Sequence, residues 1–500
     1  RRLSHERAAR AAAACSREMN AEVCLKETSG NTRVVADLRQ RVLHLLDQKH
    51  RAGKPLLEGQ ELDFSNDAQL AQHVERICLR DVPAGPTPPA STATVHVHRM
   101  YDEEAAEESA GGEGDDEGSV AFQMFLLPAR EFEGLWETLL YETDIKQRLL
   151  RYVATAMRFS EMGIDSRVIA WNRVVLLHGP PGTGKTSLCK ALAQKVAIRL
   201  SHSYQQGHLI EINAHSLFSK WFSESGKMVL GMFAKIKEIL EDDDAFVCVL
   251  IDEVESLTAA RKAAISGNEP SDAVRVVNAL LTQLDGLKRY KNALVVTTSN
   301  LTGAIDAAFV DRADIKQYIG PPGLGARYDI LTSCLLELRR AGVVAPFEEL
   351  LPHASLLPLL PHPPPSFELL QGLSVAPTGS QAPRHSMMLH ALAARCEGLS
   401  GRALRKLPFL AHANLIASPA TVSLEAYLDA LHRSTVRAVQ TGRGAPRLVC
   451  LLRARLAAWA PSHRLGLAAH SPNFAVPTPH PGPDHAGTAP SSSRATCARS

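Results

Sequence analysis

Apolar and polar residues follow two different periods along the middle of this chain. From Val174 to Pro322, short apolar runs typical of buried strands alternate with longer segments that have helical spacing. The expected strands are Val174–His178, Leu209–Asn213, Phe246–Ile251, Ala293–Ser299 and Gln317–Ile319. This alternation is typical of an α/β fold in which crossover helices connect the strands of a parallel sheet. We therefore predict such a subdomain at 171–322.

The preceding region, residues 20–128, mixes both periods and predicts a separate α+β domain. Val34 to Leu46 has helical spacing, whereas Thr94–His98 and Val120–Leu127 have the pattern of strands. Between these strands lies an acidic, glycine-rich tract at 102–117. Because so many carboxylates cannot be buried together, the tract predicts a solvated loop, with a docking site for a basic partner as the alternative.

The remaining segments are distinguished mainly by composition. Residues 129–170 have the apolar spacing of a helical connector, and a helical subdomain is expected at 323–440. Inside it, residues 352–385 are rich in Pro and Ser and predict a disordered insert. Residues 441–500 combine Arg with Pro and Ser and predict a disordered basic tail. The Arg- and Ala-rich leader at 1–19 is expected to be disordered or artefactual, with a mitochondrial transit peptide as the alternative.

Overall composition narrows the class of protein. The 500 residues are 45% apolar and 22% charged, which is ample for a sizeable core, and the net charge of +2 argues neither for nor against a nucleic-acid partner. The nine cysteines are dispersed without a C-x-x-C pair, so a disulfide framework is not expected. No apolar run approaches the roughly 20 residues that a membrane-spanning helix needs. Nucleus or cytoplasm is therefore the expected location.

A phosphate-binding loop follows the first predicted strand of the α/β region. Its sequence is Gly179-Pro180-Pro181-Gly182-Thr183-Gly184-Lys185-Thr186, which matches G-x-x-x-x-G-K-T in full. The glycines let backbone N–H groups face the phosphates, and the helix that follows adds the positive end of its dipole. Lys185 is placed to reach the β- and γ-phosphates, and the Thr186 hydroxyl to ligate Mg²⁺. The loop predicts ATP and Mg²⁺ as cofactors.

Two further strand ends carry candidate catalytic residues. The apolar strand Phe246–Ile251 ends in Asp252 and Glu253, and we expect this end to lie beside the phosphate loop. Asp252 is predicted to hold Mg²⁺ through water, and Glu253 to act as the general base toward the attacking water. A later strand ends at Asn300, whose amide is a candidate to orient that water or touch the γ-phosphate. An asparagine at a strand end is also a common turn former, so this signal is weak by itself.

These motifs, taken in order, resemble an AAA+ module. The resemblance makes 323–440 the small helical lid, and Gly398–Arg402 (GLSGR) resembles the motif that carries its sensor-2 arginine, Arg402. The arginine-finger region of AAA+ proteins usually has two arginines that bracket Pro-Gly, whereas here one is present. Arg312 is the candidate finger, and a surface ion pair with Asp311 or Asp314 is the alternative.

Longer stretches of sequence resemble the pachytene checkpoint protein 2 family. The matching segments are Leu177–Ala193, Ser216–Lys227, Leu250–Arg261, Phe309–Pro322 and Gly398–Ala413. The resemblance implies a homohexamer that remodels HORMA-domain proteins, helped by a comet-type adaptor, in spindle-checkpoint silencing and in the control of meiotic recombination and the chromosome axis. It also implies a nuclear protein with a cytoplasmic pool and association with kinetochores or chromosomes. A membrane is not implied, and direct binding to nucleic acid is not expected. Residues 352–385 and 441–500 do not resemble the family.

Trp221 and Phe222 stand where AAA+ rings carry a pore loop. Ser223-Glu224-Ser225-Gly226-Lys227 follows them and is polar. An aromatic side chain offers a large apolar contact at low rotamer cost, which suits a grip on an extended polypeptide, and so we predict threading through a central pore. The alternative is a buried helix face after Leu217 and Phe218. Other functions left open are microtubule severing, a nucleic-acid loader, and a nucleotide-gated scaffold without turnover.

Overall fold

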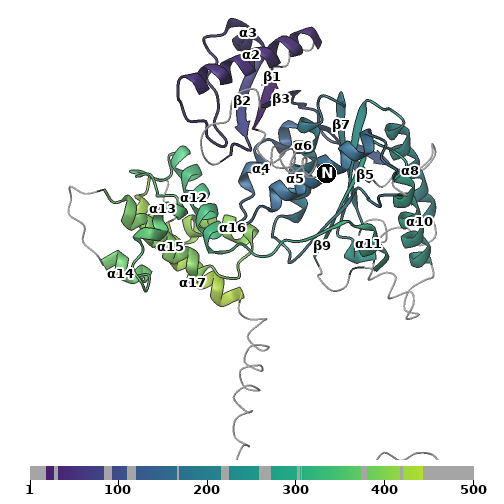
Figure 1. The fold of residues 1–500 in the computed structure, drawn as a ribbon. Helices are drawn as coiled ribbons and strands as arrows, with labels where there is room; N and C mark the ends of the chain where they lie inside the picture. Colours follow the sequence, from purple (N-terminus) through teal and green to yellow (C-terminus); the bar gives the residue numbers. More distant parts are fainter. Residues whose placement is uncertain are drawn as a thin grey trace, which may run out of the picture. The chain divides into compact units, whose positions relative to one another are not determined.

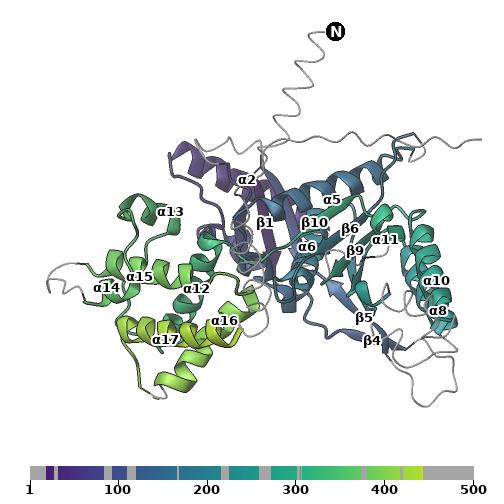
Figure 2. The ribbon, with the colours of Figure 1, turned by 90° about the horizontal axis from the view of Figure 1, so that it is seen from below.

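The structure is a computed structural model. It describes residues 19–26, 32–83, 93–109, 120–165, 168–214, 225–257, 272–300, 305, 307–372, 380–416 and 420–442. Figures 1 and 2 show these elements in two views. None of the helices within these ranges is long and apolar enough to cross a membrane.

The N-terminal domain is built on a three-stranded sheet of order β2-β1-β3. The central strand β1 (Asn20–Leu25) pairs antiparallel with β2 (Val74–Arg80) and parallel with β3 (Thr94–Arg99). Helix α2 (Thr32–Arg51) contributes the buried Leu38, Val42 and Leu46, which are spaced by four residues on one face. The short helix α3 (Ala68–His73) is capped by the Asp67 side chain. The domain therefore has its own apolar core, as expected for a mixed α+β unit.

A seven-stranded sheet forms the centre of the ATPase region in the described part of the chain. Its order is β10 (Ile315–Tyr318), β6 (Val174–His178), β9 (Ala293–Ser299), β8 (Ala245–Asp252), β7 (Gln206–Asn213), β5 (Val120–Leu127) and β4 (Ala106–Ser109). The strands from β10 to β7 are parallel to their neighbours, whereas β5 runs antiparallel to β7. The expected parallel sheet is therefore present, with an antiparallel edge.

That antiparallel edge corrects the boundary of the N-terminal domain. We expected β5 to belong to residues 20–128, but it pairs with β7, and β4 pairs with β5. The reason is burial, since Phe122 and Phe125 pack into the two cores of the large sheet. Part of the acidic tract is therefore a strand and not a loop, while residues 110–119 lie outside the described residues.

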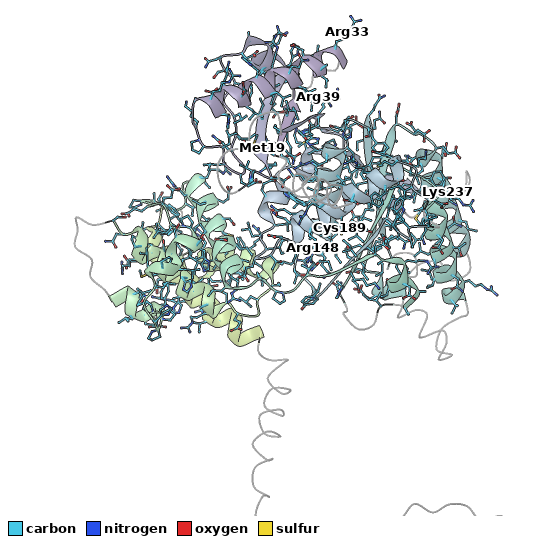
Figure 3. All side chains as sticks on the ribbon, in the orientation of Figure 1. Met19, Arg33, Arg39, Arg148, Cys189 and Lys237 are labelled. Atoms are coloured by element: carbon cyan, nitrogen blue, oxygen red, sulfur yellow. The ribbon has the colours of Figure 1, made fainter. Side chains whose placement is uncertain are left out.

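Helices cover both faces of the large sheet. Val174 and Leu176 of β6 pack in a core with α8 (Ser225–Leu240) and α10 (Asp272–Leu287), which lie side by side in Figures 1 and 2. Val175 and Leu177 face the other core, with α5 (Ile145–Glu161) and α6 (Lys185–Arg199). Because successive strand residues point to opposite faces, a strand buried on both sides is continuously apolar. Lys237 of α8 donates to Gln283 of α10 at 2.6 Å, and Cys189 of α6 is fully buried (Figure 3).

The connector from β5 to β6 is only partly helical. It contains the single turn η2 (Arg130–Phe132), the short α4 (Leu135–Thr138) and the longer α5. Residues Leu139 to Thr143, for which we expected helix, are not helical. The Tyr152 hydroxyl of α5 donates to Asp314 Oδ2 at 2.6 Å and so fixes the connector against the start of β10.

The C-terminal lid is a bundle of helices with a continuous core. Its elements are α12 (Leu324–Arg340), α13 (His353–Leu356), η3 (Leu357–Leu359), α14 (Phe367–Gly372), α15 (Ala382–Arg395), α16 (Gly401–Ala411), η4 (His412–Ile416) and α17 (Leu424–Gly442). The two long helices α12 and α15 are in contact.

This bundle overturns the expected disordered insert at 352–385. Residues 353–359 and 367–372 are helical, and Leu356, Phe367 and Leu370 are buried in the lid core. The prolines occupy positions that tolerate them: Pro352 precedes α13 and Pro383 stands in the first turn of α15. Composition alone suggested disorder because Pro and Ser are frequent in this segment and its apolar residues show no regular period. Residues 373–379 and the expected tail from 443 onward lie outside the described residues.

Candidate nucleotide site

The phosphate loop connects β6 to α6 and depends on its glycines. Gly179, Gly182 and Gly184 have φ values of 150°, 76° and 89°, which residues with a side chain rarely adopt. A Cβ on Gly179 would lie 2.1 Å from the carbonyl oxygen of Ile319, an impossible contact. Helix α6 begins at Lys185, directly after the last glycine of the loop. The backbone thus curls tightly at the start of a helix, where N–H groups are free to bind an anion.

The Lys185 ammonium lies inside the loop. Its Nζ donates to the carbonyl oxygens of Gly179 and Pro180, each at 2.9 Å, and to Asn300 Oδ1 at 2.8 Å. These three acceptors are neutral, and no ion pair of Lys185 occurs among the described residues. Burial lowers the pKa of Lys185, against the opposing effect of the Glu255 and Asp252 charges. A buried cation with neutral partners fits a phosphate ligand well, because the ligand would bring the missing negative charge.

Thr186 and Asp252 come together from α6 and β8. The Thr186 hydroxyl donates to Asp252 Oδ1 at 3.0 Å and Oδ2 at 3.2 Å, and the Thr298 hydroxyl of β9 also donates to this carboxylate. A hydroxyl beside a carboxylate, next to a phosphate loop, is the oxygen-donor set that Mg²⁺ prefers. The residues present therefore fit the metal that the sequence predicts.

Glu253 has an unusual backbone conformation for a residue with a side chain. Its φ is 59°, and conformations of this kind cost on the order of 1–3 kcal/mol and gather at functional sites. Its N–H donates to Thr298 Oγ1 at 3.2 Å, and that of Val254 to the Thr298 carbonyl at 2.9 Å, which holds the turn. Asn300 Nδ2 donates to Glu253 Oε1 at 3.4 Å. Asn300 thus contacts both the Lys185 ammonium and the Glu253 carboxylate.

The sheet order explains this bridging position and corrects one expectation. We placed the strand that ends in Asp252 beside the phosphate loop, but β9 lies between β6 and β8. Asn300, which follows β9, is therefore between the loop and the two carboxylates. The sequence alone gave only weak evidence that Asn300 is a site residue. The strand order strengthens that evidence, because ligands of parallel sheets bind at the carboxyl ends of the strands.

The lid contacts the phosphate loop through the start of α16. Ser400 caps this helix by accepting from Ala403 N at 3.3 Å, and Arg402 N donates to the Gly182 carbonyl at 3.1 Å. A Cβ on Gly182 would lie 2.8 Å from Ser400 Oγ, so the contact is close. The Arg402 side chain lines the cavity beside the loop.

That cavity, of about 290 Å³, contains residues that sequence reasoning missed. Besides the phosphate loop and Arg402, its lining includes Thr138, Leu139, Leu140, Tyr141, Pro322 and Ile330. Leu139 and Leu140 fitted the apolar face of the expected connector helix, so nothing in the pattern marked them as site residues. In the structure they leave the helix, and Leu139 approaches Gly184, where an added Cβ would be 3.2 Å from its Cδ2.

The candidate arginine finger is not brought into this site. Arg312, on α11 (Ala307–Arg312), donates to both oxygens of Asp285, at 3.1 and 2.6 Å, and to the Ala308 carbonyl at 2.6 Å. The ion pair that we weighed as the alternative to a finger therefore exists, but with Asp285 and not with Asp311 or Asp314. Trp221 and Phe222 lie outside the described residues.

Comparisons with known proteins agree with this geometry. The family model of the ATPase family associated with various cellular activities (AAA) matches residues 175–321. The model of the TRIP13-like, AAA+ ATPase lid C-terminal domain matches residues 323–439, across the segment for which we expected disorder.

Two relatives and one solved structure are similar over most of this chain. The pachytene checkpoint protein 2 homolog of Oryza sativa subsp. indica is 55% identical over 354 residues, which cover 70% of this chain and 72% of that protein. The homolog of Gallus gallus is 54% identical over 341 residues, covering 68% and 74%. The solved structure of C. elegans PCH-2 covers 85% of this chain and 100% of its own, with 33% identity and a TM-score of 0.65. The site, the lid and these relatives together show that the chain belongs to the pachytene checkpoint protein 2 family of AAA+ ATPases.

Proposed function

We propose that this chain forms a hexamer that uses ATP hydrolysis to unfold HORMA-domain proteins locally. One observation carries the hydrolytic part: Asn300 links Lys185 and Glu253, while Thr186 contacts Asp252. A nucleotide-gated scaffold without turnover needs the phosphate loop but not a carboxylate held beside it. Family membership supports the substrate class.

The contacts of the nucleotide site support the following residue roles. Glu253 takes the proton from the attacking water, and Asn300 orients that water between Glu253 and the γ-phosphate. Lys185 neutralises phosphate charge, and Thr186 and Asp252 would hold Mg²⁺, which when bound stabilises the charge that develops on the phosphates. Arg402 senses the γ-phosphate from the lid. The adenine base fits the apolar wall of the cavity formed by Leu139, Leu140 and Ile330.

Hydrolysis would be completed by a neighbouring subunit. Arg312 is the candidate arginine finger, and it must exchange its Asp285 partner for the neighbour's γ-phosphate. An arginine already held by a carboxylate is pre-formed for a bidentate contact with phosphate oxygens. This exchange would link subunit assembly to turnover.

The remodelling step is assigned to Trp221 and Phe222. These aromatics grip an extended segment of the HORMA protein and draw it through the central pore as subunits hydrolyse ATP in turn. A comet-type adaptor presents the checkpoint substrate to the N-terminal domain. We assign the protein to spindle-checkpoint silencing and to the control of meiotic recombination and the chromosome axis. It would act in the nucleus, with a cytoplasmic pool and at kinetochores or chromosomes.

Trp221→Ala tests the proposal by separating hydrolysis from remodelling. ATP turnover should survive, because the proposal assigns Trp221 to the substrate and not to the nucleotide, while the conversion of a HORMA protein should fail. Conversion is measured by hydrogen exchange of the HORMA protein, and assembly by light scattering with and without ATP. Leu230→Ala is the matched control, because Leu230 is an apolar residue on the following helix that is 51% exposed.

The proposal is refuted if wild-type protein neither assembles with ATP nor changes the exchange of the HORMA protein. If Trp221→Ala remodels normally, the pore assignment is wrong. Co-pelleting with microtubules, with turnover that rises on their addition, would favour severing instead.

A further inference from the structure

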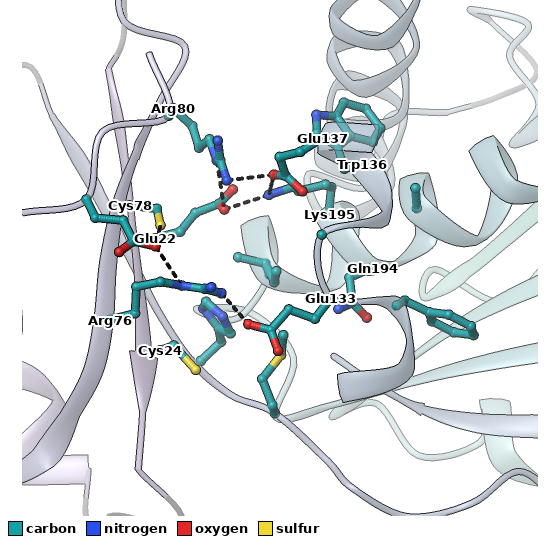
Figure 4. A pocket seen from close by; sticks show the side chains of 18 residues that line it. Glu22, Cys24, Arg76, Cys78, Arg80, Glu133, Trp136, Glu137, Gln194 and Lys195 are labelled. Carbon is teal, nitrogen blue, oxygen red and sulfur yellow. Dashed lines mark hydrogen bonds and ion pairs between the residues drawn. The ribbon is translucent and has the colours of Figure 1, made fainter. Parts of the chain in front are cut away.

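A cluster of buried and half-buried opposite charges joins the N-terminal sheet to the helix that follows the phosphate loop (Figure 4). Glu22, on the central strand β1, is only 6% exposed. Its Oε2 accepts from Lys195 Nζ at 2.7 Å, and its Oε1 lies 3.6 Å from Arg199 Nη2. Lys195 and Arg199 stand near the end of α6, whose first residues, Lys185 and Thr186, belong to the nucleotide site. One helix therefore reaches from the candidate nucleotide site at its start to the N-terminal domain at its end.

The neighbours of this pair complete a balanced network. Arg199 also pairs with Asp81 at 2.7 Å, and Lys195 with Glu137 of α4 at 3.3 Å. Glu137 in turn pairs with Arg80 of β2 at 2.6 Å. The network borders a cavity of about 450 Å³ between β1, β2, α4 and α6. Each carboxylate faces a cation from another element, so the network specifies how these elements meet.

Burial makes this arrangement sensitive to displacement. Burial raises the pKa of Glu22, but Lys195 and Arg199 outweigh it and lower the pKa to about 2. The pKa of Glu137 is also lowered, since Lys195 and Arg80 outweigh its burial. A buried ion that loses its partner keeps its desolvation cost without the compensating attraction. The contact between the N-terminal sheet and α6 is therefore stable when each ion faces its partner. It is strongly disfavoured when either element is displaced so that the partners separate.

Helix α6 is a suitable transmitter because it is continuous. At about 1.5 Å per residue, a helix of this size spans on the order of 20 Å without a break. Its apolar side is packed in the core along nearly its whole length, from Leu188 through Leu192 to Val196, all of which are buried. A helix packed in this way moves as one rigid element, so a displacement at the phosphate end also reaches Lys195.

We propose that Glu22 is a positioning residue that couples the N-terminal domain to the nucleotide site through Lys195 and Arg199. Nucleotide-dependent movement of α6 shifts the N-terminal domain. In the opposite direction, a substrate bound to that domain alters ATP turnover. That this substrate is a HORMA-domain protein rests on the proposed function. The coupling itself rests on the cluster alone.

The first test compares nucleotide states without any substrate. Hydrogen exchange of the β1 and β3 peptides is measured with ATP and with ADP, in a Glu253→Gln background that preserves ATP. With Glu22 present, exchange at β1 and β3 should differ between the two nucleotides. In Glu22→Gln this difference should vanish. Glu22→Gln leaves Lys195 and Arg199 without the carboxylate that they face and therefore risks unfolding the protein. The double variant Glu22→Gln/Lys195→Met is made in parallel, because it removes one charge of each sign.

The second test measures ATP turnover with and without a HORMA protein and its adaptor. Basal turnover of both Glu22 variants should match wild type, while stimulation by the HORMA protein should be lost, and Glu22→Asp should restore part of it. Asp37→Asn is the matched control, because Asp37 pairs with Arg41 within α2 and away from α6. This control should behave as wild type in both tests.

The outcomes distinguish the coupling through Glu22 from the proposed remodelling of HORMA-domain proteins. If the folded double variant keeps the nucleotide-dependent exchange difference, or keeps full stimulation, the coupling is overturned. If wild type shows the exchange difference but no stimulation by the HORMA protein, the proposed function fails and the coupling stands.

Discussion

Replacing Phe367 with alanine tests whether the proline-rich segment is part of the folded lid. Phe367 is 1% exposed, and its ring stacks on His432 with centroids 4.1 Å apart and planes 9° from parallel. Its helix α14 is fixed by Arg384, whose Nε donates to the Leu370 carbonyl at 2.9 Å, so the segment cannot easily collapse into the space left. Phe→Ala at a buried site costs about 3–5 kcal/mol, and this site should lie within that range.

Hydrogen exchange within the lid is the appropriate assay, because several subdomains make global unfolding unsuitable for a two-state analysis. A loss of about 3–5 kcal/mol corresponds to roughly 10²- to 4 × 10³-fold faster exchange for amides of α15 and α17 that exchange only when the lid opens. Leu369→Ala is the control on the same helix, because Leu369 is 59% exposed. Its effect should stay within about 0.5 kcal/mol. If both variants exchange alike, the segment is not packed in the lid and the reasoning fails.

Three further predictions concern the nucleotide site and the N-terminal domain. Glu253→Gln should lower ATP turnover by roughly 10²–10⁴ while ATP binding is retained, and turnover close to wild type would exclude Glu253 as the base. Arg402→Ala should lose most turnover with the helix content unchanged, as checked by circular dichroism, because Ser400 and the Arg402 N–H hold α16 without the side chain. Acid should loosen the N-terminal domain first. Burial lowers the pKa of His98 from 6.5 to about 4, so protonation of the unfolded chain removes stability as pH falls below 6.5; Glu22, lowered from 4.5 to about 2, adds a further loss below 4.5. Faster exchange in β6 and β9 than in β1 and β3 on acidification would contradict this order.

The local parts of the site were predictable from sequence because they depend on neighbouring residues. The strand at Val174–His178 matches β6, and the glycine pattern that follows it requires a loop of one shape before a helix. Family resemblance was equally accessible, because the residues that carry it are contiguous. The fold class followed from the alternation of strands and helices.

The parts that were missed depend on residues far apart in the chain. Glu22 and Lys195 are 173 positions apart, and no periodicity relates them. The pairing of β5 with β7 depends on which apolar face is left free after the helices are placed. Leu139 shows a third reason why the sequence was insufficient. An apolar residue next to a predicted helix can either continue that helix or line a cavity, and the pattern does not distinguish the two. In the proline-rich segment, composition was given more weight than its few buried side chains.

The contact between Gly179 and the Ile319 carbonyl has a consequence for how this gene can vary. Even alanine would place an atom 2.1 Å from that oxygen, so the position is closed to every other residue before phosphate binding is considered. Selection for a folded chain alone would therefore preserve this glycine. A paralogue that lost its catalytic carboxylate and its lysine could drift at those positions and still retain Gly179. An intact glycine here is consequently poor evidence that a diverged relative is still an active ATPase.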